Sequence, residues 1–345
     1  MFNRWHGHSV PNLVVARRII DKMTAAAGFH IEDETGEAMV GLVVPGTHTN
    51  GVPTLYVLDT ISPDESAIRQ FHTFQQGDDR QDELIWWLQE NWQQHRQQHA
   101  QKKWDVPLRY LGDWHKQPGF MIQPSGGDLL TALDCLDDPS NRMDFLLAPI
   151  VTLGHPHTIG VSNALTNFLM APQPDGTALR VDFWYIDNKS RMFMPITPTL
   201  YPNEQLPALV EYPWHLVGEE RFAGETRLLE DDGLFITLVL WDSDNQPPLE
   251  ICFLTARMGS DRLLILITSH DYPQRPPRAR VAPFVQMQPD DDMYKVFANA
   301  WVESQAVDYE PEWTPEMHLI DYVRAVEAHL GITKPESTES SEEVS

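Results

Sequence analysis

The stretch from Tyr110 to Asp128 reads YLGDWHKQPGFMIQPSGGD, and it decides how the first half of the chain is interpreted. A short strand ends at a histidine, a loop rich in proline and glycine follows, and an apolar helix comes next. Side chains two apart on a strand point the same way, so we expect His115 and Gln117 to face a common point. Ten residues separate Gln117 from Asp128, which is enough for the loop to return to that point.

These residues allow a catalytic and a structural interpretation. His115 and Asp128, with a third ligand nearby, match an open zinc site, in which three protein groups hold the metal and water takes the fourth position. Alternatively, Ser125-x-x-Asp128 suits a helix start, with Ser125 as the N-cap and an acid in the first turn. His115 at a strand end is also typical of a hydrogen-bonded structural residue.

Hydrophobic periodicity predicts both helices and strands over residues 1–197, which we assign to one domain of the α/β (α+β) class. The expected helices cover residues 11–27, 82–101 and 126–136. The expected strands cover residues 38–44, 55–58, 108–114 and 145–153, with a hairpin from 179–187 and 191–196.

The pattern changes after a proline-rich linker, which we place at residues 198–205. Residues 206–332 form a second predicted α+β domain, with an antiparallel meander as its sheet. Its expected strands cover 234–241, 249–254, 262–268 and 278–281, and its expected helices cover 218–229, 292–301 and 315–330. Residues 333–345 are rich in serine and glutamate, and we expect a disordered acidic tail.

The composition excludes several classes of partner. Lysine and arginine total 25 against 50 aspartate and glutamate residues, so the formal charge is −25 and no nucleic-acid partner is expected. The apolar runs are far shorter than the ~20 residues of a membrane-spanning helix, so no membrane partner is expected. The two cysteines, Cys135 and Cys252, cannot form a disulfide framework or a thiolate zinc cage, which predicts a cytoplasmic protein.

Over roughly residues 10–195 the sequence resembles the JAMM (JAB/MPN) metalloprotease family. The family motif is a glutamate far upstream, then His-x-His, ten residues and Asp, with Ser-x-x-Asp inside. Here Gly112-Asp-Trp-His-Lys-Gln-Pro118 stands where family members typically have Gly-Glu-Trp-His-x-His-Pro. Glu34-Thr-Gly-Glu37 stands where they typically have Glu-Thr-Gly-Gly before an apolar strand.

The resemblance implies that residues 1–197 form a JAB/MPN-type mixed sheet flanked by helices. It also implies a zinc-dependent isopeptidase that cleaves at the carboxyl terminus of a ubiquitin-like modifier. Zinc would be held by the residues at the motif positions, His115, Gln117 and Asp128. Glu34 would be the general base, and Ser125 would donate a hydrogen bond to the developing oxyanion. The partners implied are ubiquitin-like modifiers or conjugation-pathway proteins.

Gln117 departs from the family, which has its second zinc histidine at that position. A glutamine offers only a neutral amide oxygen, a weak ligand for zinc. Three interpretations follow: the site binds zinc weakly and still turns over, another ligand such as His155 or His157 replaces the histidine, or the site is inactive and the domain only binds. A plain loop role is the alternative for both histidines.

The second half resembles ubiquitin-conjugating enzymes and the related RWD domains over roughly residues 206–330. A helix, a meander and the segment Tyr272-Pro-Gln-Arg-Pro-Pro277 carry this resemblance. Conjugating enzymes need a cysteine after the proline motif, but the last cysteine here is Cys252, inside a predicted strand. We therefore expect no thioester chemistry, and a buried structural role for Cys252.

Three functions remain open from the sequence. The first is the zinc isopeptidase with a binding module, and the second is a catalytically inactive adaptor for ubiquitin-like modifiers or conjugation components. The third is a related hydrolase that acts on a small substrate, such as a sulfur carrier or a cysteine adduct. Zinc content separates the first from the second.

Overall fold

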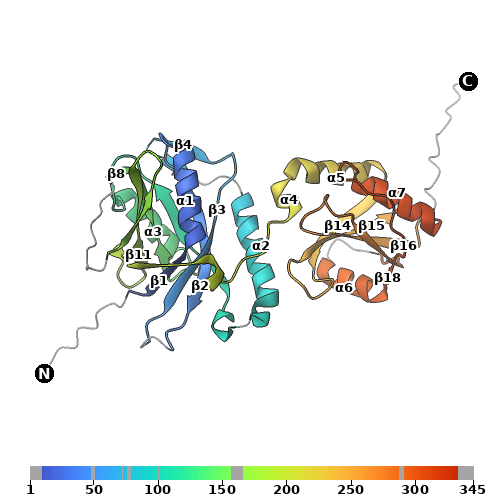
Figure 1. Ribbon diagram of the computed structural model, residues 1–345. Helices are drawn as coiled ribbons and strands as arrows, with labels where there is room; N and C mark the ends of the chain where they lie inside the picture. Colours follow the sequence, from blue (N-terminus) through green and yellow to red (C-terminus); the bar gives the residue numbers. More distant parts are fainter. Residues whose placement is uncertain are drawn as a thin grey trace, which may run out of the picture. The chain divides into compact units, whose positions relative to one another are not determined.

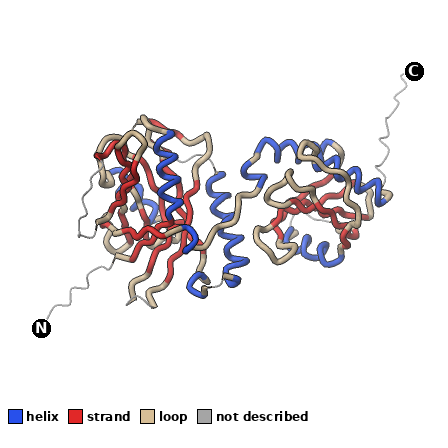
Figure 2. Tube along the Cα trace, viewed as in Figure 1, coloured by secondary structure: helices blue, strands red, loops and turns tan. Residues whose placement is uncertain are grey.

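The computed structural model describes residues 10–47, 51–71, 73–75, 79–99, 101–156, 166–286 and 291–332. The chain divides into two compact units, Met1–Leu209 and Val210–Ser345. In each unit the strands lie in the centre and helices pack outside them, so the predicted α+β class is confirmed (Figure 1, Figure 2). The predicted tail, residues 333–345, lies outside the described ranges. No helix within these ranges has the length and apolar character of a membrane span.

A mixed eight-stranded sheet forms the centre of unit 1. In spatial order its strands are β13 (Pro198–Tyr201), β1 (Asn12–Ala16), β3 (Thr54–Ile61), β2 (Gly36–Val44), β6 (Leu108–Lys116), β8 (Ile150–Pro156), β10 (Thr177–Asp182) and β9 (Phe168–Pro172). Strand β1 runs parallel to both of its neighbours, and β6 runs parallel to β8. The remaining neighbours pair antiparallel.

Two small sheets and three α-helices complete unit 1. The small sheets are β12 (Met194–Pro195), β11 (Trp184–Asp187) and β7 (Phe145–Leu147), and the hairpin β4 (Ile68–Gln70) with β5 (Thr73–Gln75). The helices are α1 (Arg17–Phe29), α2 (Arg80–His95) and α3 (Gly126–Asp137). The first seven residues of β2 are buried, as expected for a central strand that is covered on both faces.

Two predictions for unit 1 are wrong because their strand partners lie far away in the sequence. Residues 12–16 form β1 and not the start of the first helix, since they pair with β3 and β13. The predicted linker 198–205 begins with β13, whose Pro198 pairs with Leu13 and whose Tyr201 pairs with Ala16. A strand can begin with proline at a sheet edge, because no neighbour there requires its missing N–H.

One predicted strand in unit 1 is divided. Residues 145–153 were expected to be continuous, but the chain leaves the strand conformation at Ala148 and Pro149. The two halves are β7 and β8, which belong to different sheets. This break places β8 beside the end of β6.

Unit 2 contains the predicted antiparallel meander. Its five-stranded sheet has the order β14 (Leu234–Trp241), β15 (Glu250–Arg257), β16 (Arg262–Thr268), β17 (Arg278–Pro283) and β18 (Gln305–Ala306). Its α-helices are α4 (Trp214–Val217), α5 (Glu219–Asp231), α6 (Met293–Glu303) and α7 (Leu319–Leu330). Residues of α5 and α7 share one core cluster with one face of the sheet, and residues of α6 share another with the opposite face.

A buried ion cluster joins the sheet of unit 2 to α7. Arg257, 4% exposed, donates to Glu327 at 2.6 and 2.7 Å and to the Asp232 carboxylate at 2.5 Å. Both carboxylates are buried as well. A charge removed from water in this way is stable only while it is paired, so the three side chains depend on one another.

We predict that Arg257→Met lowers the free energy of unfolding of unit 2 by about 3–5 kcal/mol, because it leaves the buried Glu327 carboxylate without its cation and leaves Asp232 with Arg324 alone, at 2.7 Å. Denaturant-dependent amide exchange in β15 and β16 measures this change in the full chain. Arg262→Met is the matched control, since Arg262 is 47% exposed and lies 4.0 Å from Asp261; its effect should stay within about 0.5 kcal/mol. Equal effects of the two substitutions would contradict the prediction.

Candidate active site

The end of β6 is fixed from both sides. The His115 N–H donates to the Pro149 carbonyl at 3.1 Å, and the Gln117 N–H donates to the Val151 carbonyl at 3.0 Å. On the other side, the Lys116 N–H donates to the Thr35 carbonyl at 2.7 Å. Because side chains alternate along a strand, this backbone holds the His115 and Gln117 side chains on the same face.

The start of α3 supplies the third polar group. Ser125 caps the helix, with its hydroxyl accepting from the Asp128 N–H at 3.2 Å, and the Asp128 carboxylate accepts from the Ser125 N–H at 2.5 Å. The structural interpretation of Ser125-x-x-Asp128 is therefore confirmed as a reciprocal capping box. The same box fixes the position of the Asp128 carboxylate.

The two elements bring His115, Gln117 and Asp128 together. Asp128 Oδ1 lies 3.6 Å from His115 Nε2, and the Gln117 amide nitrogen lies 3.2 Å from His115 Nε2 and 3.3 Å from Asp128 Oδ2. Gln117 Oε1 is buried and has no hydrogen-bond partner. A half-turn of the amide would exchange its two ends and present the oxygen to the other two side chains.

The polar ends of the three side chains lie 3.2–3.6 Å from one another, but these contacts use both Asp128 oxygens and the Gln117 amide nitrogen, which does not bind metal ions. Zinc bonds of about 2.0–2.1 Å place neighbouring ligand atoms roughly 3.3–3.4 Å apart, so a zinc ion here requires the amide to turn its oxygen towards the other two groups. Within the described ranges, no three His, Cys, Asp or Glu side chains gather as a metal site. A metal ion held by three protein groups here therefore needs the Gln117 amide oxygen besides the imidazole and the carboxylate.

The imidazole of His115 is held in its neutral form. Burial lowers its pKa below the ordinary value, and the nearby Asp128 carboxylate opposes this shift without overcoming it. A neutral ring keeps a lone pair, which is the form that binds metal ions.

Glu34 lines the same recess as His115 and Asp128. The recess has a volume of about 400 Å³, and Phe74, Asp113 and Leu146 also line it. Glu34 lies between α1 and β2, and its N–H donates to the Gln70 carbonyl of β4 at 2.9 Å. Ser125 is not among the residues that line the recess; it lies at the start of α3.

Lys116 holds the segment that leads to Glu34, a role that the sequence interpretation missed. Its side chain leaves β6 on the face opposite His115 and is 2% exposed. Its ammonium donates to the backbone carbonyls of His30 and of Ile31, the latter at 2.7 Å. Lys116 thereby ties the end of α1 to the strand that carries His115.

Asp113 was also missed as a site residue. Its position two residues before His115 indicates that both side chains lie on the same face of the strand. Its carboxylate accepts from the Tyr110 hydroxyl at 2.7 Å, and both side chains line the recess. Burial, followed by the charge of Asp113, raises the pKa of Tyr110 well above its ordinary value. The hydroxyl therefore stays protonated and remains a donor.

His155 and Glu37 are not among the residues that line the recess. His155 Nε2 pairs with the Thr152 hydroxyl at 2.6 Å near the end of β8, and its ring packs edge-on against Phe120. His157 lies outside the described residues. Glu37, at the end of the Glu34-Thr-Gly-Glu37 segment, is buried, and its carboxylate accepts from the hydroxyls of Thr60 and Ser62.

Comparisons with known proteins give no family. No family model matches the chain, and no curated protein matches it. Among solved structures, the solution structure of protein DSY2949 from Desulfitobacterium hafniense is similar at a TM-score of 0.34 with 12% sequence identity. That match covers 55% of this chain and 93% of the other, and a likeness this weak carries no argument about function.

We predict that Lys116→Met weakens the protection of the Glu34 amide against hydrogen exchange by about 2–3 kcal/mol. The substitution keeps the aliphatic stem and removes a buried cation that donates to two part-buried carbonyls. Lys22→Met is the control, because Lys22 is 44% exposed and pairs with Asp59; its effect should be below about 1 kcal/mol. Unchanged exchange at Glu34 in Lys116→Met would contradict this role.

Proposed function

We propose that unit 1 is a zinc-dependent peptidase of the JAMM type that cleaves at the carboxyl terminus of a ubiquitin-like modifier. The observation that carries the proposal is the convergence of His115, Gln117 and Asp128 in a recess that Glu34 also lines. A neutral imidazole and an adjacent carboxylate are parts that metal-assisted hydrolysis requires.

The arrangement of unit 1 supports the proposal. A mixed sheet carries His115 at the end of β6, and Asp128 enters from the first turn of α3. The side chains of His115 and Lys116 leave β6 on opposite faces. Since His115 meets α3 and Lys116 meets the end of α1, the two helices lie on opposite sides of the sheet. The strand end and the helix start thus bring together His115 and Asp128, the two residues that match the family's zinc ligands.

Each residue then has a role. Bound zinc would lower the pKa of a water molecule towards ~7 and polarise the scissile carbonyl. The Glu34 carboxylate accepts a proton in the recess and delivers it to the leaving amine. Ser125 keeps a hydroxyl proton while its oxygen accepts from Asp128 N–H, so it can still donate to an oxyanion. Its place outside the recess lining makes it the weakest of these assignments.

An inactive adaptor remains the second candidate, and one observation favours it. Among the described residues, the site has two strong zinc ligands and an amide in place of the third. Neutral amide oxygens bind zinc weakly, so the affinity of this site decides between slow turnover and binding alone.

We propose that unit 2 is a ubiquitin-conjugating-enzyme-like module that binds a modifier or a conjugation component. The meander, the flanking helices and a fully buried Cys252 support this. Burial raises the pKa of Cys252 well above its ordinary value, so this thiol is a poor nucleophile. The Tyr272 hydroxyl donates to the buried Glu225 carboxylate at 2.6 Å, which gives the proline segment a structural anchor.

We predict that Gln117→His tightens zinc binding by at least roughly tenfold, because imidazole is a far better zinc ligand than an amide oxygen. Competition titration with a zinc-binding dye measures the affinity, and cleavage of modifier fusions after a terminal Gly-Gly measures the activity. Hydrolysis should rise with zinc occupancy, and Glu34→Ala should abolish it in both backgrounds.

The matched control is Gln123→His, which introduces the same imidazole at an exposed position of the same loop. It should leave zinc affinity at the native level. If Gln117→His binds zinc tightly but cleaves nothing, the adaptor is favoured. If neither zinc affinity nor hydrolysis changes, the three groups do not form the metal site.

A further inference from the structure

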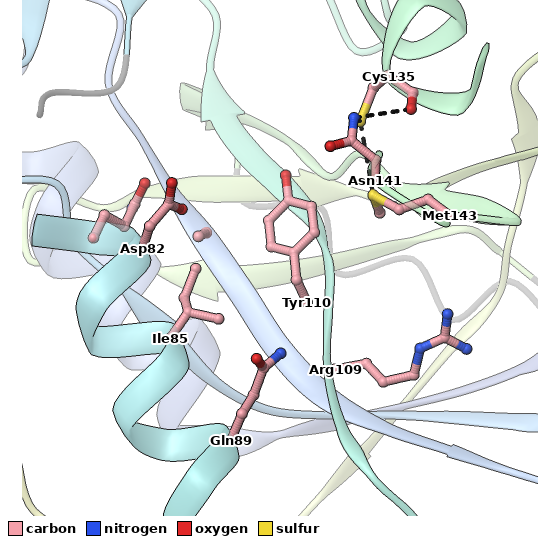
Figure 3. Close-up of a pocket in the computed structure, with 10 residues that line it drawn as sticks. Asp82, Ile85, Gln89, Arg109, Tyr110, Cys135, Asn141 and Met143 are labelled. Carbon is pink, nitrogen blue, oxygen red and sulfur yellow. Dashed lines mark hydrogen bonds between the residues drawn. The ribbon is translucent and has the colours of Figure 1, made fainter. Parts of the chain in front are cut away.

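Strand β14 forms one edge of the sheet of unit 2. It pairs with β15 over all eight of its residues, from Leu234 to Trp241, without a bulge. Long strands in the centre of a sheet have a partner on each side; strand β6, whose Arg109 and Tyr110 line the recess of Figure 3, lies between β2 and β8. Among the described residues, the other side of β14 has no strand beside it.

The outer side of β14 offers backbone hydrogen-bonding groups. In an antiparallel pair every second residue points its N–H and C=O away from the partner, so half of the eight residues present a donor and an acceptor outward. Within the described ranges, no side chain or backbone group outside the sheet hydrogen-bonds to them. The Phe235 and Leu238 side chains are 59% and 40% exposed, so solvent reaches this strand on both faces of the sheet.

The other edges of the two large sheets carry features that prevent the addition of a strand. Strand β18 has two residues, β13 begins at Pro198, and β9 ends at Pro172. Proline has no N–H to donate, and a strand of two residues offers few groups to pair with. Strand β14 reads LFITLVLW and contains neither proline nor a charged residue. It is therefore the edge at which a further strand can pair.

The charges at the two ends of β14 indicate which strand this is. Glu230 and Asp231 precede the strand and are exposed, and Asp242 and Asp244 follow it. A second copy of the chain, paired antiparallel, would bring the start of one strand beside the end of the other, and acids would face acids. A segment with lysine or arginine on both sides of an apolar strand meets the opposite charge at each end.

We propose that the edge of β14 binds an extended segment of another protein, in which about six apolar or β-branched residues stand between basic residues. The segment extends the sheet by one strand. Its main chain pairs with β14, and its side chains pack beside Phe235 on one face of the sheet and beside Leu238 on the other. This inference goes beyond the proposed function, because it rests on strand pairing and charge and uses neither the candidate metal site nor the resemblance of unit 2.

A pair of peptides tests the chemistry of the partner. The probe is Lys-Lys-Val-Thr-Val-Thr-Val-Thr-Lys-Lys, and its control has glutamate in place of every lysine. Fluorescence anisotropy of the labelled peptide measures its affinity for the full chain. At low ionic strength the lysine peptide should bind at least roughly tenfold more tightly than the glutamate peptide, and added salt should reduce this difference.

Hydrogen exchange resolved to single amides tests the mode of binding. The lysine peptide at saturation should slow the exchange of every second amide of β14 by at least roughly tenfold, because only the outward N–H groups gain a partner. The amides of β14 that already pair with β15 are the internal reference.

Substitutions test where the peptide binds. Phe235→Ser combined with Leu238→Ser should weaken the lysine peptide by at least roughly fivefold, because both exposed apolar side chains of the edge are lost. Phe284→Ser combined with Val302→Ser is the matched control. It also removes two exposed apolar side chains, after β17 and in α6, and should leave the affinity within about twofold of the native value.

Each contrary result overturns the inference. Equal affinities for the two peptides would exclude a basic partner, and binding without slowed exchange in β14 would exclude this edge. A dimer in sedimentation without peptide, with every second amide of β14 already protected, would assign the edge to a second copy. No binding at up to about 1 mM peptide would also overturn it. Glu34→Ala should bind the lysine peptide as the native chain does, so failure of the proposed peptidase leaves this test unaffected.

Discussion

The carboxylate of Asp128 is the constraint on which the first unit depends. It accepts the Ser125 N–H and so closes the start of α3, and it also lies 3.6 Å from His115 Nε2 and 3.3 Å from the Gln117 amide. The structural and catalytic interpretations of this sequence are therefore not alternatives. A helix start positions acidic groups well, because its free N–H groups hold a carboxylate without side-chain freedom. The Asp128 carboxylate is therefore held in a fixed position beside His115 and Gln117.

On the opposite face of the sheet, strand β6 is held by the polar contacts of Trp114 and Lys116. Trp114 donates through its indole N–H to the Thr60 hydroxyl at 3.0 Å and to the Glu37 carboxylate at 3.3 Å. Lys116 reaches the carbonyls after α1. Polar groups buried under a sheet are stable only when hydrogen-bonded, so these contacts resist any slip of β6. A slip of one residue would exchange the faces of His115 and Lys116.

The sequence predicted what local patterns determine. The capping box at Ser125, the strand that leads to His115 and the meander of unit 2 all follow from short-range signals. Strand β1 was not predicted, because Leu13 and Val14 fit the apolar stripe of a helix equally well. Only pairing with the strand that begins at residue 198 makes this segment a strand. The return of Asp128 to His115 was predicted from loop length, but the direction in which the Gln117 amide points was not.

Tertiary contacts also determine the surroundings of Lys116 and His155, which the sequence did not predict. Lys116 stands between two predicted ligands, and nothing in its neighbours along the chain indicates that it meets carbonyls 85 and 86 positions away. The environment of His155 was equally hidden, because its ring packs against Phe120, 35 positions away in the sequence, while its Nε2 pairs with the Thr152 hydroxyl. Local periodicity gives the face of a side chain, and only packing gives its partner.

The buried Gln117 oxygen completes this reasoning. An amide oxygen without a hydrogen bond loses about 1–3 kcal/mol relative to one that is paired, so folded chains retain few of them. Here the unpaired atom belongs to the residue that lies between an imidazole and a carboxylate. The amide satisfies its nitrogen at both neighbours and leaves its oxygen unsatisfied. A half-turn of the amide would place its oxygen beside the imidazole and the carboxylate, where a proton on His115 Nε2 or a bound cation would be its partner. The orientation of the Gln117 amide therefore distinguishes the metal-free site from the metal-bound site that the proposed function requires.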